Sequence, residues 1–333
     1  MAGITGRCMA ACDIGGTKVL IGLVDEEGAL LARERYPVQA PRMPAQVVGE
    51  LTARLRALAE RAGIAWEQVS GLGYSTPGPL DRARRVIISC LNLGPWENVS
   101  LKAMLQDSLG VPAWLEMDAL AATLGEGWLG AGQGVADFIY LVVGTGIGCG
   151  LLVDGRPVRG WAGSAGEIGH LTIVPGGPPC NCGNYGCLEE LAAGPAIARR
   201  AQAALWQGRE TIISQQSNGS DITAEAVFAA ARSGDAVALS IVDETAEYLG
   251  IALAGLANLL NPQVIALGGG VGQGGGDVLL EAVRRATLRH CPSWITGQGL
   301  DIRTARLGDD AGLLGAARVG WLGLNGEHEA DVS

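Results

Sequence analysis

The sixteen residues that begin at Met9 read MAACDIGGTKVLIGLV, and they place a polar turn, Asp13 to Lys18, between two apolar runs. This pattern predicts two antiparallel strands joined by a glycine turn. Residues 29–36 predict a third strand, and residues 44–62 predict a helix because their apolar side chains recur at a helical period. Strands at 69–74 and 113–116 complete the first half of the chain.

A second copy of the opening pattern begins at Phe138 and reads FIYLVVGTGIGCGLLV. Aligning Gly15 with Gly144 also aligns Asp25 with Asp154. The alignment alone fits two copies of one supersecondary unit and chance similarity of two glycine-rich hairpins equally well, and the glycine clusters decide for two copies. The second half continues with a helical stretch at 224–260, a buried strand at 264–267 and a final helix at 311–324.

Three glycine clusters follow predicted strands, and together they indicate a nucleotide site. Adjacent glycines let backbone N–H groups face an anion, and a carboxylate at a strand end suits Mg²⁺. A Gly-Gly-Thr turn alone is more often a simple hairpin, and the helix that follows a Walker A loop is missing here. The candidate nucleotide-binding residues are Asp13, Gly15, Gly16, Thr17, Lys18, Gly144, Thr145, Gly146, Gly269 and Gly270.

Composition and charge exclude several classes of protein. The chain has 333 residues, 48% of them hydrophobic and 52 of them glycine, which excludes a disordered chain or a simple helical bundle. Its formal net charge of −10, without a basic run, argues against a nucleic-acid partner. The most apolar stretches, 138–153 and 249–271, are interrupted by glycine, asparagine or proline, so we expect no membrane span. With no export signal at the start, we expect a cytoplasmic protein.

The eight cysteines fall into two groups. Five are scattered among apolar neighbours and are expected to be small buried hydrophobic residues: Cys8, Cys12, Cys90, Cys149 and Cys291. The other three crowd into the sequence CNCGNYGC, residues 180–187, behind two prolines. These three cysteines are either reduced thiols in a flexible loop or ligands of a metal ion.

From Asp13 to the final helix, the sequence resembles the ROK family of sugar kinases and related repressors, in the actin/hexokinase/Hsp70 superfamily. The most specific match is Glu167-Ile-Gly-His170, nine further residues, and then Cys180-x-Cys182-Gly-x-x-Gly-Cys187-Leu-Glu189. The resemblance implies an α/β, two-lobed, actin-like ATPase (ribonuclease H-like) fold with duplicated βββαβαβα domains and a nucleotide and sugar cleft between them. We expect lobes at 1–118 plus 312–333 and at 119–311.

The same resemblance implies a structural zinc ion and a sugar site. His170, Cys180, Cys182 and Cys187 form a Cys₃His set with no coordination position left for water. Glu167, His170 and Glu189 match family residues that hydrogen-bond sugar hydroxyl groups, so His170 is expected to use one ring nitrogen for each task. The other two histidines, His290 and His328, are expected to be ordinary surface residues.

Asp118 matches the family's catalytic aspartate, which accepts the proton of the attacking sugar hydroxyl; without the resemblance, a helix N-cap would be the simpler interpretation. The sequence departs from the family beside it, where Met117 and Leu120 replace the two asparagines of Asn-Asp-Ala-Asn. A lost amide puts the preferred sugar in doubt. Two loops, 75–81 and 92–96, loosely match those that line the family's sugar cleft; Asn92 is a candidate sugar contact there, and Trp96 is as well explained by packing.

The function implied is ATP-dependent phosphorylation of a hexose, with glucose to glucose 6-phosphate as the first expectation. N-acetylmannosamine, N-acetylglucosamine, fructose and allose are alternative acceptors, and a catalytically weak sugar sensor is another alternative. ROK repressors carry a helix-turn-helix ahead of the first turn, and because Asp13 comes so early we expect none here. The expected cofactors are ATP, Mg²⁺ and structural Zn²⁺, and the expected assembly is a homo-oligomer, a dimer or tetramer.

Overall fold

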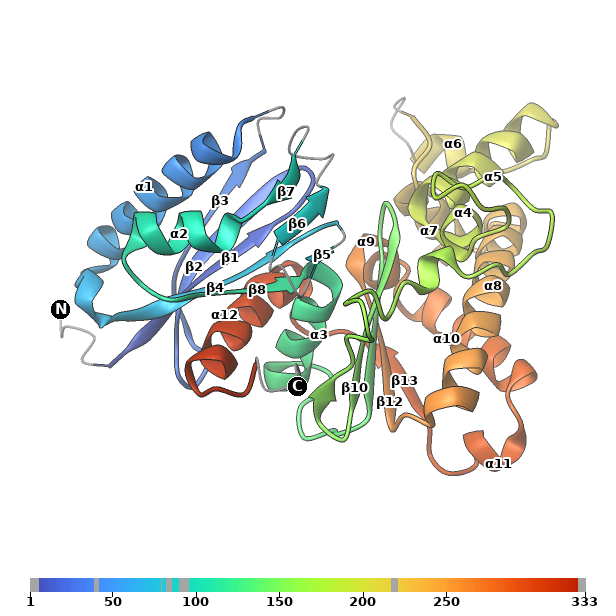
Figure 1. The fold of residues 1–333 in the computed structure, drawn as a ribbon. Coiled ribbons are helices and arrows are strands. Elements are labelled where there is room, and N and C mark those ends of the chain that lie inside the picture. The colour runs from blue at the N-terminus through green and yellow to red at the C-terminus, as the bar shows by residue number, and fades with distance from the viewer. Residues whose placement is uncertain are drawn as a thin grey trace. The chain divides into compact units, whose positions relative to one another are not determined.

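The protein is described here by a computed structural model that covers residues 6–38, 42–78, 80–81, 86–89, 96–216 and 221–328. The chain forms two compact units, which are described separately (Figure 1). Unit 1 comprises Met1–Gln133, Pro157–Ala165 and Asp309–Ser333, and unit 2 comprises Gly134–Arg156 and Gly166–Gly308.

Unit 1 is built on a five-stranded mixed sheet in the order β3-β2-β1-β4-β8. The first three strands are antiparallel neighbours, whereas β1, β4 and β8 run parallel. The strands are β1 (Cys8–Ile14), β2 (Lys18–Asp25), β3 (Leu30–Pro37), β4 (Val69–Thr76) and β8 (Ala113–Met117). A smaller sheet contains β5 (Leu80–Asp81), β6 (Val86–Ser89) and β7 (Glu97–Val99).

Helices cover both faces of this sheet (Figure 1). Helices α1 (Pro44–Ala62) and α2 (Leu101–Leu109) lie on one face, and α3 (Asp118–Leu129) and α12 (Ala311–Leu324) lie on the other. Alternation along β1 explains the two layers, since Cys8, Ala10, Cys12 and Ile14 share a core with the apolar stripe of α1. The bounds expected for α1 and α12 are confirmed.

Helix α12 lies unusually close to its neighbours because glycines occupy the crossing points. A Cβ at Gly73 of β4 would lie 1.7 Å from the Ala316 carbonyl oxygen, and a Cβ at Gly315 would lie 1.7 Å from that of Ala121 in α3. No side chain fits in either gap. The small residues that mark 311–324 in the sequence therefore bring the last helix onto the backbone of β4 and α3.

Unit 2 repeats the same sheet in the order β11-β10-β9-β12-β13. Its strands are β9 (Phe138–Val143), β10 (Ile147–Val153), β11 (Arg156–Pro157), β12 (Val264–Gly268) and β13 (Asp301–Thr304). Again β9 pairs antiparallel with β10 and parallel with β12, and β12 pairs parallel with β13. The repeated order confirms the duplication and the actin-like α/β class expected from the sequence.

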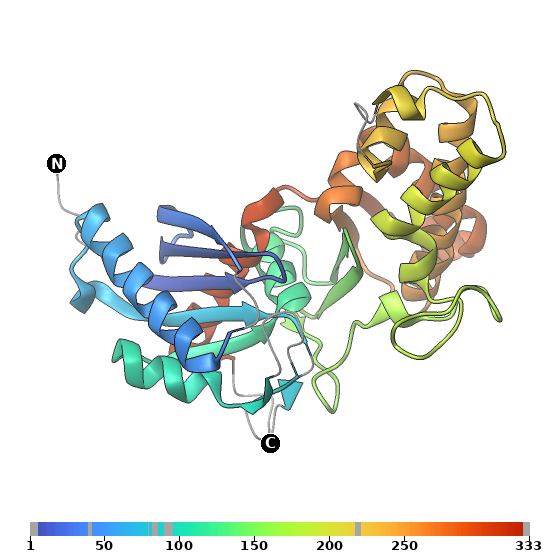
Figure 2. The ribbon, with the colours of Figure 1, turned by 90° about the horizontal axis from the view of Figure 1, so that it is seen from above.

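The helices of unit 2 gather in one layer (yellow to orange in Figure 2), where α10 packs along α8. The helical stretch expected at 224–260 is interrupted at Gly234, whose φ is +84°, and the Asp235 side chain caps the next helix by accepting from the Ala238 N–H at 2.8 Å. The helices are α4 (Leu188–Ala192), α5 (Gly194–Trp206), α6 (Ile213–Gln216), α7 (Ala224–Arg232), α8 (Ala236–Leu260), α9 (Gly269–Gly274), α10 (Gly276–His290) and α11 (Ser293–Thr296).

The two units are defined by packing, and α3 belongs to unit 1 because it packs against α12. The lobes expected from the repeat, 1–118 with 312–333 and 119–311, remain a prediction. Among the described residues, every helix is too short or too polar to cross a bilayer.

Candidate functional site

The first glycine turn joins β1 to β2 and places the Asp13 carboxylate at the end of β1. The Gly15 N–H donates to the Lys18 carbonyl at 2.9 Å and closes the turn. The Ser75 hydroxyl, at the end of neighbouring β4, donates to Asp13 Oδ1 at 2.7 Å. Burial raises the pKa of the Asp13 carboxyl above its ordinary value, although the Ser75 hydrogen bond and the Lys18 charge act in the opposite direction. A largely buried carboxylate with a fixed orientation suits a cation or phosphate site.

The start of α12 completes the surroundings of Asp13. A Cβ at Gly312 would lie 2.4 Å from Asp13 Oδ2, so only glycine lets the helix approach the carboxylate. Just before this helix, Asp309 Oδ2 lies 2.9 Å from Lys18 Nζ and 3.5 Å from a nitrogen of Arg35. The Lys18 charge is therefore already paired within unit 1, a contact that the sequence analysis did not anticipate.

Asp118 lies at the junction between β8 and α3, as its place in the motif predicts. It is the first residue of α3, after the N-cap Met117, and its Oδ1 accepts from the Ala119 N–H at 2.7 Å. A carboxylate at a helix N-terminus is stabilised in its ionised form. Leu120 is buried, with 6% of its surface exposed, so at this position the chain has an apolar core residue where the family has a polar amide.

The second glycine turn joins β9 to β10 and contains Gly144, Thr145 and Gly146. The Gly144 N–H donates to the Gly146 carbonyl at 2.9 Å, and the Gly194 N–H at the start of α5 donates to the Gly144 carbonyl at 2.8 Å. Glu189 of α4 contacts the other side of the turn, where its Oε2 accepts from the Ile147 N–H at 2.8 Å. The expected sugar residue Glu189 and the expected nucleotide turn are thus in direct contact.

The third glycine cluster follows β12 and packs against the end of β9. Gly269 has a φ of +76°, and a Cβ there would lie 2.5 Å from the Val143 carbonyl oxygen. A Cβ at Gly270, in contrast, would meet nothing within 4 Å. The cluster is therefore adjacent to the second turn within unit 2, with open space at Gly270.

The segment that carries Glu167 and His170 is held against β10 by two glycines. A Cβ at Gly166 would lie 2.2 Å from the Cys149 carbonyl oxygen, and a Cβ at Gly169 would lie 2.3 Å from that of Ile147. This close backbone approach places the one-turn 3₁₀ helix η2 (Ile168–His170) beside the strand. Close packing against β10 therefore explains why these two positions of the motif are glycine.

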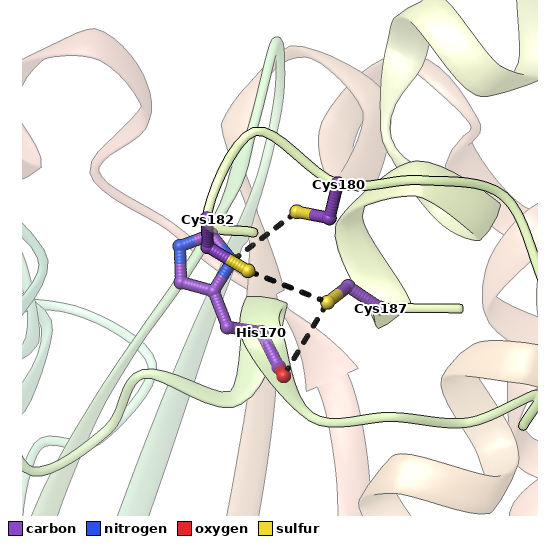
Figure 3. Close-up of side chains that lie close together, drawn as sticks. All are labelled: His170, Cys180, Cys182 and Cys187. Carbon is purple, nitrogen blue, oxygen red and sulfur yellow. Dashed lines mark hydrogen bonds between the residues drawn. The ribbon is translucent and has the colours of Figure 1, made fainter. Parts of the chain in front are cut away.

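The four expected metal ligands come together (Figure 3). The ligand atoms of His170, Cys180, Cys182 and Cys187 all lie within 4.8 Å of one another. His170 Nδ1 is 3.6 Å from Cys180 Sγ, and the sulfurs of Cys182 and Cys187 are 3.7 Å apart. In a tetrahedral zinc site with Zn–S bonds of about 2.3 Å, neighbouring sulfurs lie about 3.8 Å apart. The donor set and its spacing therefore fit one tetrahedral cation.

The thiols of this cluster differ in acidity. Burial, followed by hydrogen bonds with the other two thiols, raises the pKa of Cys187 to about 12. The exposed Cys182 has a lowered pKa, first because of a backbone hydrogen bond at Asn184 and then because of Cys180. Three thiolates this close repel one another, and a divalent cation relieves that repulsion.

One buried cluster was missed by the sequence analysis. Arg159 Nε donates to Glu116 Oε2 at 2.7 Å, with about 5% of each side chain exposed, and His328 Nε2 lies 3.3 Å from the same oxygen. The expectation that His328 is an ordinary surface residue is therefore wrong, because its side chain is only 11% exposed and packs against a carboxylate. His290 is exposed and pairs with Glu247 at 2.6 Å. Burial would raise the pKa of Glu116, but the nearby His328 and Arg159 side chains outweigh it and hold the pKa below its usual value.

The remaining expectations have mixed outcomes. Trp96 is buried, and its indole N–H donates to the Arg42 carbonyl at 2.7 Å, which is a packing role. Asn92 and Cys90 lie outside the described side chains. Four of the scattered cysteines are buried as expected: Cys8, Cys12, Cys149 and Cys291.

Comparison with known proteins tests the resemblance. Residues 9–320 match the ROK family. A glucokinase of Halalkalibacterium halodurans is 35% identical over 321 residues, which is 96% of each chain. The structure is similar to a ROK hexokinase of Thermus thermophilus (TM-score 0.78, 37% identity, 96% of this chain and 100% of that one). It is also similar to a ROK glucokinase of Streptomyces griseus in complex with glucose and AMPPNP (TM-score 0.77, 33% identity, 93% and 98%). The match to the family profile spans nearly the whole sequence, so this chain belongs to the ROK family.

Proposed function

We propose that this protein transfers the γ-phosphoryl group of ATP to a hexose, with glucose as the first candidate acceptor. The observation that carries the proposal is full-length similarity to a glucokinase and to a ROK glucokinase that binds glucose and AMPPNP. Within unit 1, the carboxylates of Asp13 and Asp118 at the ends of parallel strands are consistent with that activity.

Asp118 is the proposed general base. Phosphoryl transfer passes through a loose transition state, so positioning and charge stabilisation supply most of the acceleration. A carboxylate that orients the attacking hydroxyl and takes its proton late needs no unusual pKa. The helix N-terminus of α3 and the hydrogen bond from the Ala119 N–H fix the orientation of this carboxylate.

The two glycine turns are the proposed sites for the phosphates. Gly15, Gly16, Thr17 and Lys18 belong to the first turn, and Gly144, Thr145 and Gly146 belong to the second. Asp13 is the proposed acceptor for hydrated Mg²⁺, which when bound would neutralise part of the phosphate charge. Gly269 and Gly270 are proposed to leave room for the nucleoside, which is consistent with the open space at Gly270.

The sugar hydroxyl groups are assigned to Glu167, His170 and Glu189. His170 directs Nδ1 toward Cys180, which leaves its Nε2 for a hydroxyl group. We assign structural Zn²⁺ to His170, Cys180, Cys182 and Cys187, on the donor set and spacing given above. Its proposed effect is indirect, because it holds the segment that carries these side chains.

The kinase assignment is tested by measuring ATP consumption over a panel of glucose, N-acetylmannosamine, N-acetylglucosamine, fructose and allose. We expect glucose to give the highest kcat/KM. Because Met117 offers no amide, a preference for another hexose would keep the kinase assignment and change only the acceptor. Failure of every sugar to stimulate ATP consumption would reject the kinase and leave the sugar sensor.

The metal assignment is tested by the zinc content of purified protein. We expect about one zinc per chain, falling close to zero in Cys182→Ser. Cys291→Ser is the matched control, since Cys291 is a buried cysteine of unit 2 outside the cluster, and its zinc content should equal that of the wild type. Equal and near-zero zinc in all three proteins would reject the assignment.

We further propose that the protein assembles as a homo-oligomer, a dimer or a tetramer. Light scattering coupled to size exclusion measures the mass in solution, and a mass of 34.2 kDa would correspond to a single chain and refute this point.

A further inference from the structure

Glu189 has a contact that its assignment to the sugar does not explain. Its Oε2 accepts from the Ile147 N–H at 2.8 Å, forty-two residues away along the chain. Ile147 is the first residue of β10 and directly follows the second nucleotide turn. The carboxylate is half-buried, so this hydrogen bond is partly protected from competition by water. The Glu189 side chain, which is assigned to the sugar, therefore also contacts the backbone of the second turn.

The backbone of the turn is shaped around this carboxylate. A Cβ at Gly146 would lie 2.5 Å from Glu189 Oε2, closer than a real Cβ approaches any atom. Gly146 has no positive φ, so the backbone conformation does not require glycine, and a side chain here would displace the Glu189 carboxylate. The turn and the carboxylate thus fit each other sterically as well as through the hydrogen bond.

A second contact holds the turn from its other end. The Gly194 N–H, where α4 passes into α5, donates to the Gly144 carbonyl at 2.8 Å. The corner from Glu189 to Gly194 therefore contacts both the first and the last residues of the turn. Since both contacts come from one short corner, a shift of α4 would move the turn with it.

The position of this corner depends on the signature segment. Cys187, one of the four candidate metal ligands, is the N-cap residue of α4. The next residue, Leu188, donates its N–H to the Leu171 carbonyl at 2.9 Å, directly after His170. The cluster thus fixes the start of the helix that carries Glu189.

We propose that Glu189 is a positioning residue for the second nucleotide turn, in addition to its assigned contact with the sugar. The inference rests on the proposed kinase function. Its hydrogen bond holds the Ile147 N–H and, through it, the backbone of Gly144 to Gly146 in the conformation that receives phosphate. Because one carboxylate serves both ligands, occupancy of one site changes the affinity of the other, and this coupling is reciprocal.

The test is calorimetric titration of the full chain with Mg–AMPPNP in the absence of sugar. Glu189→Ala removes the acceptor, and we expect the Kd to rise about tenfold, the low end for a lost hydrogen bond to a charged group. Glu189→Gln keeps an acceptor oxygen and removes only the charge, so its Kd should stay within about twofold of the wild type. Glu190→Ala is the matched control, because the neighbouring carboxylate pairs with Arg199 at 2.8 Å instead. Circular dichroism and zinc content check that each variant is folded.

Gly146→Ala disturbs the same contact by adding a methyl group to the turn. We expect it to raise the Kd about tenfold by displacing the carboxylate. In the Glu189→Ala background the atom that clashes is gone, so adding Gly146→Ala should raise the Kd by less than about twofold. Such non-additivity is the signature of two residues acting through one contact.

Three results would overturn the inference. The first is unchanged Mg–AMPPNP affinity in Glu189→Ala. The second is an equal rise of the Kd in Glu189→Gln and Glu189→Ala, which would show that the charge of Glu189, and not its acceptor oxygen, holds the turn. The third is additivity of Gly146→Ala and Glu189→Ala. If any of these results is obtained while the wild type consumes ATP with a hexose, the inference about Glu189 fails and the proposed function stands. If the wild type binds no Mg–AMPPNP, both the inference and the proposed function fail.

Discussion

The two glycine turns begin from the same repeated hairpin but acquire their charged groups differently. In the first turn, four residues separate the paired Ile14 and Val19, and Asp13 and Lys18 belong to the hairpin itself. In the second, three residues separate the paired Val143 and Ile147, and the aligned strand end carries Val142 in place of Asp13. Its carboxylate comes from Glu189, in a helix whose start lies at the Cys/His cluster.

Duplication fixes the backbone of the two turns, while each copy places its charged groups separately. Unit 1 places carboxylates at its own strand ends, Asp13 near the end of β1 and Asp118 directly after β8, and pairs the nearby Glu116 with Arg159. Unit 2 has no carboxylate at the aligned strand end, and Glu189 of α4 contacts its turn instead. Unit 1 should therefore respond most to loss of charge, and unit 2 to loss of metal.

The largest effect should come from Asp118→Asn, which removes the proposed base from unit 1. We expect kcat for glucose to fall about 10²- to 10⁴-fold, the usual contribution of general base catalysis, with little change in Kd for the sugar. A coupled ADP assay measures the rate. Full activity of this variant with the best sugar would show that Asp118 is not the general base.

Arg159→Met should produce the next largest effect, because it removes the guanidinium group that pairs with the buried Glu116 carboxylate. Loss of one partner of a buried ion pair costs about 3 kcal/mol, which lowers Tm by roughly 10 °C in a domain of this size. Arg7→Met is the control, since Arg7 and Glu26 form an exposed pair and should contribute little.

The pH dependence of this variant has a definite sign. The pKa of Glu116 is held below its ordinary value of 4.5, so the stability it contributes is complete above pH 4.5 and is lost as the pH falls through its folded pKa. The difference in Tm between wild type and Arg159→Met should therefore be largest near neutral pH and shrink below pH 4.5. A difference that grows toward acid would contradict the assigned role of the pair.

Asp13→Asn should separate stability from activity at the first turn. Burial raises the Asp13 pKa above 3.8, so ionised Asp13 destabilises the fold at neutral pH. This cost shrinks as the pH falls through the raised folded pKa and is gone below pH 3.8. We expect Tm at pH 7 to rise by about 2–4 °C, with the gain vanishing toward pH 4, while kcat/KM for ATP falls about 100-fold.

The corresponding change in the second turn is Thr145→Val, which removes an exposed hydroxyl group and no charge. Its Tm should stay within about 1 °C of the wild type, since exposed substitutions of this kind seldom matter. If both variants shifted Tm equally, the distinction between a charged and a neutral turn would fail.

The smallest effect should come from Met117→Asn, which restores the family's amide beside Asp118. Met117 is half-buried, and its backbone N–H donates to Glu116 Oε1 at 3.1 Å. The substitution leaves this backbone hydrogen bond in place and adds only a side-chain donor. We expect KM for glucose to fall about threefold, the effect of one neutral hydrogen bond. An unchanged KM for every hexose would show that the amide is not what this site lacks.

Much of the fold followed from local patterns. Apolar runs beside glycine turns predicted β1 and β9, helical periodicity predicted α1 with its observed bounds, and the small residues of 311–324 predicted α12. The break before α8 was missed, because Ser233 and Gly234 interrupt an otherwise continuous apolar period by only a turn. The resemblance to the ROK family also predicted that the three cysteines and His170 would meet, and their ligand atoms lie within 4.8 Å of one another.

The sequence by itself determined the repeated strand–turn–strand hairpin, the glycine turns and the crowding of three cysteines at 180–187, because each depends on residues close together or on a regular period. Only the tertiary structure decided that Ser75 and Gly312 surround Asp13, that Arg159 and His328 meet Glu116, and that Glu189 holds the Ile147 N–H. Those contacts join residues far apart in the chain, and their energy depends on burial and direction. The spacing of residue types along the chain specifies neither burial nor direction.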